Sequence, residues 1–124
     1  MLASAPIIAF LATANAKRAK AFYRDVLKLN LVSEDDFAIV FDAGGTMLRI
    51  VKVARPTIAP YTVLGWHVAD IAAAMRTLKR RGVRFQRYKG LPQDKSGVWT
   101  SPGGAKIAWF KDPDGNTMSI TQFG

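Results

Sequence analysis

Residues 110–120 read FKDPDGNTMSI, and this stretch does most to decide the fold. Its centre, Asp112-Pro113-Asp114-Gly115-Asn116, has the composition of a tight turn, because proline fixes φ while glycine and asparagine tolerate positive φ. The runs on either side, 106–111 and 117–122, are predicted to be strands. In this context Asp112 and Asp114 are interpreted as turn formers rather than as paired catalytic carboxylates.

Upstream of this stretch, the second half of the chain predicts one helix among further strands. An apolar strand is expected over 61–68, another strand over 84–88, and an inserted hairpin around Gly103 and Gly104. Asp70 can cap the helix, and Gly82 can end it. The expected buried stripe of this helix consists of Ile71, Ala74, Met75 and Leu78.

The first half of the chain nearly repeats this order of elements. Strands are expected over 7–12, 29–33, 37–42 and 46–53, with a tight hairpin at Gly44 and Gly45. Asn15 can cap a helix whose apolar stripe is Ala19, Phe22, Tyr23, Val26 and Leu27. Pairing Asn15 with Asp70, Phe41 with Phe110 and Arg49 with Ser119 aligns the halves at offsets of 55, 69 and 70 residues. The difference is the inserted hairpin.

The bulk composition predicts a soluble protein of one domain. A chain of 124 residues has the usual size of one domain, here with a first module over 1–54, a linker with two prolines over 55–60 and a second module over 61–124. No run approaches a membrane span, and the apolar N-terminus lacks the basic residues of a signal peptide, so we expect a cytoplasmic protein. The absence of cysteine excludes disulfides, thiolate metal sites and Cys nucleophiles.

The formal net charge of +9 raises the question of nucleic acid as a partner. Most of the basic residues follow the polar sides of the two predicted helices, and the aromatic residues fall at core-like positions. A nucleic-acid surface would interleave the two kinds of residue. The charge is therefore interpreted mainly as solvated helix faces, and nucleic-acid or polyanion binding is the least favoured function.

The chain resembles the vicinal oxygen chelate superfamily, which includes glyoxalase I, extradiol dioxygenases and bleomycin-resistance proteins. The resemblance spans nearly the whole chain and is carried by AKAFYRDVLKLNL at 19–31, WHVADIAAAMRTLKRRGV at 66–83 and FKDPDGNTMSI at 110–120. It implies an α+β fold of two βαβββ modules in one domain, forming a curled half-barrel sheet with a central cleft. It also implies a cleft lined by the first and last strands of each module, and commonly a homodimer.

Metal-dependent members of this superfamily take their ligands from the first and last strands, and the resemblance places those positions at Ile8, Val63, Arg49 and Ser119. Divalent metals need imidazole or carboxylate donors there, and a guanidinium would repel the ion. We therefore expect no metal and no cofactor.

Three further residues are candidates for a ligand-binding site in this cleft. Phe10 should share the face of Ile8, while Trp66 should point to the helix side and most other aromatic residues should be core. His67, the single histidine, should share the face of Val63; it could bind ligand or transfer a proton, although a structural role is favoured. Trp99 lies in the inserted hairpin, which could cover the cleft.

Arg49 has two interpretations that the sequence leaves equally open. It could grip a carboxylate or phosphate with its planar guanidinium, or it could be a strand-edge residue paired with Asp or Glu.

The favoured function is a metal-independent small-molecule binding protein of the glyoxalase/bleomycin-resistance type, with a partly apolar anionic ligand. Its predicted ligand-binding residues are Ile8, Phe10, Arg49, Val63, His67, Trp99 and Ser119. The alternative is an enzyme, a glyoxalase-like lyase, isomerase or dioxygenase, whose catalytic residues the sequence does not identify. The cationic bleomycins themselves are disfavoured as ligands, because a +9 protein repels cations at long range.

Overall fold

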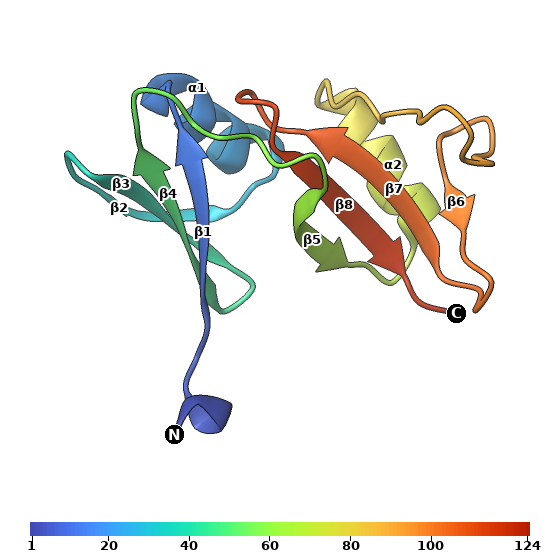
Figure 1. Cartoon of the computed structure of the whole chain (residues 1–124), viewed down its shortest axis with the longest axis horizontal. Coiled ribbons are helices and arrows are strands. Elements are labelled where there is room, and N and C mark those ends of the chain that lie inside the picture. Colours follow the sequence, from blue (N-terminus) through green and yellow to red (C-terminus); the bar gives the residue numbers. More distant parts are fainter. The chain divides into compact units, whose positions relative to one another are not determined.

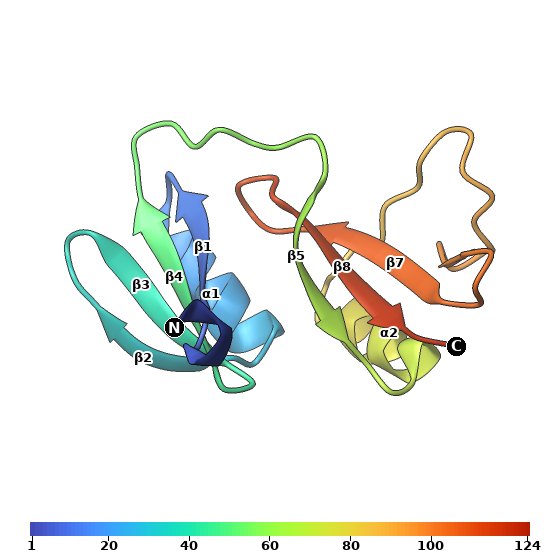
Figure 2. The same cartoon turned by 60° about the horizontal axis from the view of Figure 1, so that its bottom comes forward.

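The computed structural model describes residues 1–124, and the chain divides into two units, Met1–Ile58 and Ala59–Gly124. Each unit contains one four-stranded sheet with a helix on one of its faces (Figures 1 and 2). The mixed α+β class and the βαβββ order of elements in the first unit agree with the sequence prediction. None of the helices is long or apolar enough to cross a bilayer.

The first unit contains a sheet in the order β1-β4-β3-β2. Its elements are η1 (Leu2–Ser4), β1 (Ile8–Thr13), α1 (Ala16–Ala21), η2 (Phe22–Val26), β2 (Asn30–Glu34), β3 (Ala38–Ala43) and β4 (Thr46–Lys52). β1 runs parallel to β4, and the other neighbouring strands are antiparallel. The turn between β3 and β4 contains Gly44 at φ 60° and Gly45 at φ 92°, as the Gly-Gly pair predicts.

The first helix is shorter than its apolar stripe suggests. Asn15 caps α1 by accepting the Arg18 N–H at 3.1 Å, as expected. The α-helix ends at Ala21 and continues as the π turn η2, in which the Leu27 N–H donates to the Phe22 carbonyl at 3.0 Å. Tyr23 lies in this π turn and is fully buried, so its ring faces the core.

The second unit contains a sheet in the order β5-β8-β7-β6. Its elements are β5 (Thr62–His67), α2 (Ile71–Arg80), β6 (Trp99–Thr100), β7 (Lys106–Lys111) and β8 (Thr117–Gln122). Asp70 caps α2 through the Ala73 N–H at 3.1 Å, and Gly82 follows the helix with φ 94°. β5 and β8 are parallel, like β1 and β4 in the first unit.

The strand predicted over 84–88 does not form, and the two-residue β6 takes the edge position instead. One ladder-like bond remains, from the Gln86 N–H to the Trp109 carbonyl at 2.7 Å. The side chain of Gln93 hydrogen-bonds to other backbone groups of this segment: it accepts from the Tyr88 N–H at 2.7 Å and donates to the Gln86 carbonyl at 3.0 Å. Side-chain bonds of this kind offer the backbone an alternative to a strand ladder.

Each sheet packs one face against its own helix, and we call the other its open face (Figures 1 and 2). The helix-side cores include Ile39, Phe41, Leu48 and Ile50 in the first unit, and Ala108, Phe110, Met118 and Ile120 in the second. Alternation along the strands sends the intervening residues to the open faces. The side chains on the open faces are therefore outside the helix-side cores, and these are the side chains that a ligand could contact.

Candidate functional site

Arg49 lies in the middle of the open face of the first sheet. Its strand, β4, is an interior strand, and Arg49 stands opposite Phe10 of β1 on one side and Val40 of β3 on the other. Leu48 and Ile50, its neighbours in sequence, are almost fully buried on the helix side. Arg49 is thus half-buried on an interior strand, and the residues opposite it on both neighbouring strands are apolar.

The second interpretation of Arg49, a strand-edge residue in an ion pair, is wrong. In the first unit, ion pairs join Lys20 and Lys52 to Glu34, and Arg24 to Asp25, and none involves Arg49. The charge of Arg49 acts on the carboxylate of Asp35. The Phe37 and Ala38 N–H groups hold the pKa of Asp35 below its ordinary value, and the charge of Arg49 lowers this pKa by a smaller amount. The Asp35 carboxylate is thus already held by backbone donors, at 2.8 and 2.9 Å.

Ile8 and Phe10 lie on the same open face as Arg49. The parallel register of β1 and β4 sets Phe10 beside Arg49. Ile8, two residues before Phe10 and so on the same face, pairs with Met47. Ile8 is 49% exposed and Phe10 is 61% exposed, unusually high values for large apolar side chains on a sheet. The structure therefore brings these three predicted residues together on one face.

Ser119 occupies the corresponding place in the second sheet. It pairs with Gly65 of β5 as Arg49 pairs with Phe10, which is the equivalence that the sequence repeat predicts. A Cβ built on Gly65 would lie 2.6 Å from Ser119 Oγ, so the Ser119 hydroxyl fills the space beside this glycine. Glycine is the residue that permits such a close approach.

Val63 lies at an irregularity in β5. Thr62 pairs with Thr117 and Leu64 with Met118, so Val63 is the extra residue of a bulge. Its side chain is 37% exposed. Alternation back from Gly65 keeps Val63 on the open face, where it was predicted.

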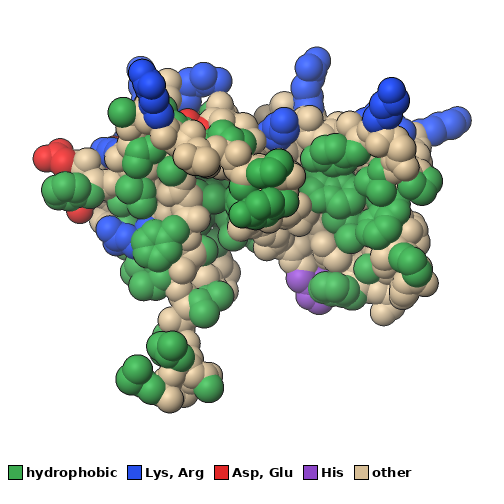
Figure 3. Space-filling model, in the orientation of Figure 1, with side chains coloured by type: hydrophobic (Ala, Val, Ile, Leu, Met, Phe, Trp, Pro, Cys, Tyr) green, Lys and Arg blue, Asp and Glu red, His purple; other side chains and the backbone are tan.

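His67 lies at the end of β5, on the same open face as Ser119. It pairs with Thr121, and its ring meets Phe123 edge-on at 5.0 Å between centroids. A hollow of about 210 Å³ is lined by Gly65, Trp66, His67, Thr121 and Phe123. Figure 3 shows the histidine at the surface next to a hydrophobic side chain. No carboxylate hydrogen-bonds to this histidine, so it lacks the partner that would orient a catalytic base.

Two aromatic residues next to these, Trp109 and Tyr88, were not predicted as site residues. Trp109, expected in the core with most of the aromatics, pairs with Ser119 on the open face and is only half-buried. Trp99 packs against it at 6.3 Å, and Tyr88 meets it edge-on at 5.6 Å. The alternation of β7 could have revealed Trp109, because its neighbour Phe110 is fully buried on the helix side.

Trp66 points to the helix side, as predicted. Its ring stacks on Phe110 at 6.3 Å. The turn aspartates also behave as predicted: Asp112 accepts the Asn116 N–H at 2.9 Å and the Asp114 N–H at 3.0 Å.

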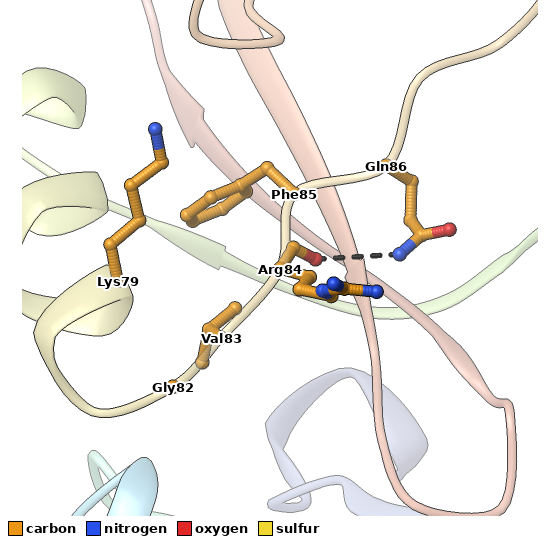
Figure 4. Close-up of a pocket in the computed structure, with 6 residues that line it drawn as sticks. All are labelled: Lys79, Gly82, Val83, Arg84, Phe85 and Gln86. Atoms are coloured by element: carbon orange, nitrogen blue, oxygen red, sulfur yellow. Dashed lines mark hydrogen bonds between the residues drawn. The ribbon is translucent and has the colours of Figure 1, made fainter.

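A larger hollow, about 620 Å³, lies at the end of α2 (Figure 4). It is lined by Lys79, Gly82, Val83, Arg84, Phe85 and Gln86, none of them a predicted site residue. Figure 4 shows the Phe85 ring turned toward Lys79 and the Gln86 amide turned back to the Arg84 carbonyl. Phe85 also packs against the core residue Phe110 at 6.0 Å, so this ring completes the core.

The positions implied for a metal do not fit a divalent ion. Ile8 and Val63 have no donor atom, Arg49 is cationic, and Ser119 offers only a hydroxyl. Nowhere in residues 1–124 do three His, Asp or Glu side chains gather as a metal site requires. The chemistry of these side chains is that of anion and apolar contacts.

The comparisons with known proteins agree with this architecture. The family model described as "Glyoxalase/Bleomycin resistance protein/Dioxygenase superfamily" matches residues 6–120. No curated protein matches the chain by sequence.

Several solved structures share the fold. A lactoylglutathione lyase from Agrobacterium tumefaciens has a TM-score of 0.73 at 18% identity, covering 96% of this chain and 93% of the other. A superfamily member from Sphaerobacter thermophilus has a TM-score of 0.75 at 21% identity, covering 98% and 99%. A third, from Alicyclobacillus acidocaldarius, has a TM-score of 0.74 at 17% identity, covering 97% and 92%. The chain belongs to the glyoxalase/bleomycin resistance protein/dioxygenase superfamily.

Proposed function

We propose that the chain is a metal-independent binding protein for a small, partly apolar anion. The observation that carries this proposal is Arg49, a half-buried residue on an interior strand that makes no ion pair and stands beside the exposed Phe10. A guanidinium held among apolar groups is weakly screened and matches the planar fork of a carboxylate or the oxygens of a phosphate. Ile8, on the same sheet face, is proposed as a further contact of this ligand. Val63, His67, Trp99 and Ser119 are proposed as ligand-binding residues of the second unit.

The charge of the chain supports an anionic ligand. A formal charge of +9 raises the local concentration of anions around the protein and repels cations. The protein is further proposed to act in the cytoplasm as a homodimer, the state common in the superfamily.

Thermal unfolding of chelator-treated protein tests this proposal. Hexanoate should raise the Tm, while the matched cation hexylammonium and the neutral hexanamide should not. Arg49→Gln should remove the hexanoate effect. Arg55→Gln, which removes the same charge from an exposed position of the same unit, should keep it. Equal shifts in the two variants would reject Arg49 as the anion-binding group.

An enzyme remains the second candidate, because the single histidine, His67, lies on the same open face as Ser119. A lyase or dioxygenase of the metal-dependent kind would require ligands other than the four positions above. Soaking the protein with Ni, Zn, Mn and Fe and measuring the retained metal separates the candidates. Stoichiometric retention would favour the enzyme, and loss of all metal on gel filtration would favour the binding protein.

A further inference from the structure

The open face of the second sheet carries small residues on β5 and β8, with aromatic residues on either side of them. Two rows of paired residues cross this face: Gly65, Ser119 and Trp109 in one, and His67, Thr121, Ile107 and Trp99 in the next. The surface between the aromatic residues is therefore glycine, serine and threonine, with Ile107 between Thr121 and Trp99. Trp109 and Trp99 stand on one side, and His67 with Phe123 stands on the other. We call this surface the aromatic trough.

The rings on the tryptophan side are held in fixed positions. The Trp109 indole N–H donates to Thr62 Oγ1 at 3.1 Å, which fixes the orientation of the ring. Tyr88 is placed against Trp109 by its own backbone N–H, which donates to Gln93 Oε1 at 2.7 Å. Rings that are already immobilised lose little conformational entropy when a ligand stacks on them.

The loop that carries Tyr88 is itself closed by side-chain bonds. Arg87 Nη1 donates to the Asp94 carbonyl at 2.9 Å, and Gln93 Nε2 donates to the Gly97 carbonyl at 2.7 Å. Asp94 Oδ1 accepts from the N–H groups of Ser96, Gly97 and Val98. These hydrogen bonds hold the loop in a conformation in which Tyr88, which is 38% exposed, lies beside Trp109. In Figure 3 hydrophobic side chains gather over β7 and the region of β6.

The charges around the trough favour an anion over a cation. The acidic residues of this unit are Asp70, Asp94, Asp112 and Asp114, and each belongs to a helix cap, the loop or the turn. No carboxylate is thus left to neutralise a cation between the rings, as recognition of a quaternary ammonium would need. Lys111 follows Trp109 on the open face by alternation and is exposed.

We infer that the aromatic trough binds a planar aromatic ring that carries a carboxylate or a similar anionic group. The ring lies against Trp109 and Trp99, and the anionic group reaches the hydroxyls of Ser119 and Thr121. This inference rests on the proposed function only in taking the ligand to be an anion. It adds the aromatic ring, which Arg49 does not select.

Two tryptophans of this surface report ligand binding directly. In wild-type protein labelled with ¹⁵N, benzoate should shift the indole N–H signals of Trp99 and Trp109 with saturation. Cyclohexanecarboxylate has the same number of carbon atoms and the same charge, and it should bind at least about fivefold more weakly. Trp99→Leu, on the two-residue β6, should weaken benzoate by about fivefold and leave cyclohexanecarboxylate unchanged.

The possible outcomes distinguish this inference from the proposed function. Equal affinity for the two acids, or no shift at Trp99 and Trp109, overturns the aromatic trough; the proposed function then stands if Arg49→Gln abolishes binding. The indole shifts should persist in Arg49→Gln protein, because residues of the second unit alone make the trough; the Tm test of Arg49 then decides the proposed function independently. Because the shifts are measured on wild-type protein, the test does not depend on the folding of a tryptophan variant.

Discussion

Replacing Gly65 by alanine should destabilise the protein through one atom, the Oγ of Ser119. The new Cβ would lie 2.6 Å from that oxygen, 3.4 Å from the Ser119 carbonyl oxygen and 3.9 Å from its Cβ. Only the first distance is shorter than an ordinary contact. Ser119 is 9% exposed, so its hydroxyl has little room to rotate away, and overpacking of this kind costs about 1–3 kcal/mol.

A second substitution isolates this contact. In a Ser119→Ala background the close oxygen is gone, and Gly65→Ala should stabilise by about 0.5–1 kcal/mol because it reduces the entropy of the unfolded chain. The coupling free energy of the double-mutant cycle, the difference between these two effects of Gly65→Ala, should therefore be about 1.5–4 kcal/mol. Urea unfolding at constant m-value measures all four proteins. A coupling near zero would show that Gly65 is not required by the Ser119 hydroxyl.

Two further predictions concern acid stability and the loop of the second unit. Hydrogen bonds from Lys20 and Lys52 lower the pKa of Glu34 from 4.5 to about 2, so its stabilising effect is present above pH 4.5 and is lost as the pH falls toward about 2. Glu34→Gln should flatten the pH dependence of the unfolding free energy across this window, and an unchanged slope would contradict the assignment. Gln93→Ala should speed hydrogen exchange at the Tyr88 amide, while Gln86→Ala, which loses one 3.4 Å bond, should not; equal rates would show that Gln93 does not hold the loop.

Much of the fold could be predicted from short-range patterns. The bounds of β7 and β8 follow from the turn at residues 112–116, whose residue types specify the backbone they need. The repeat also fixed the register by which Arg49 and Ser119 occupy equivalent places. Helix caps at Asn15 and Asp70 were readable for the same reason, because each acts within three residues.

The failures arose where longer-range competition decides the structure. Residues 84–88 include Phe85 and Tyr88, residue types common in strands, but their backbone groups are partly bonded by Gln93, which no local pattern reveals. Trp109 was assigned to the core by residue type, although it neighbours Phe110 and the two cannot share a face in one strand. Arg49 was ambiguous because its ion pairing depends on where the acids fall, which the sequence does not give.

The most direct measurement is the side-chain Nε–H resonance of Arg49 in chelator-treated protein, assigned by its loss in Arg49→Lys. On titration with hexanoate this resonance should shift and saturate with the same Kd as the heat of binding. Addition of divalent metal should change neither value. An Arg49 signal that stays still while the anion binds, or binding that appears only after metal is added, would contradict anion recognition by this guanidinium.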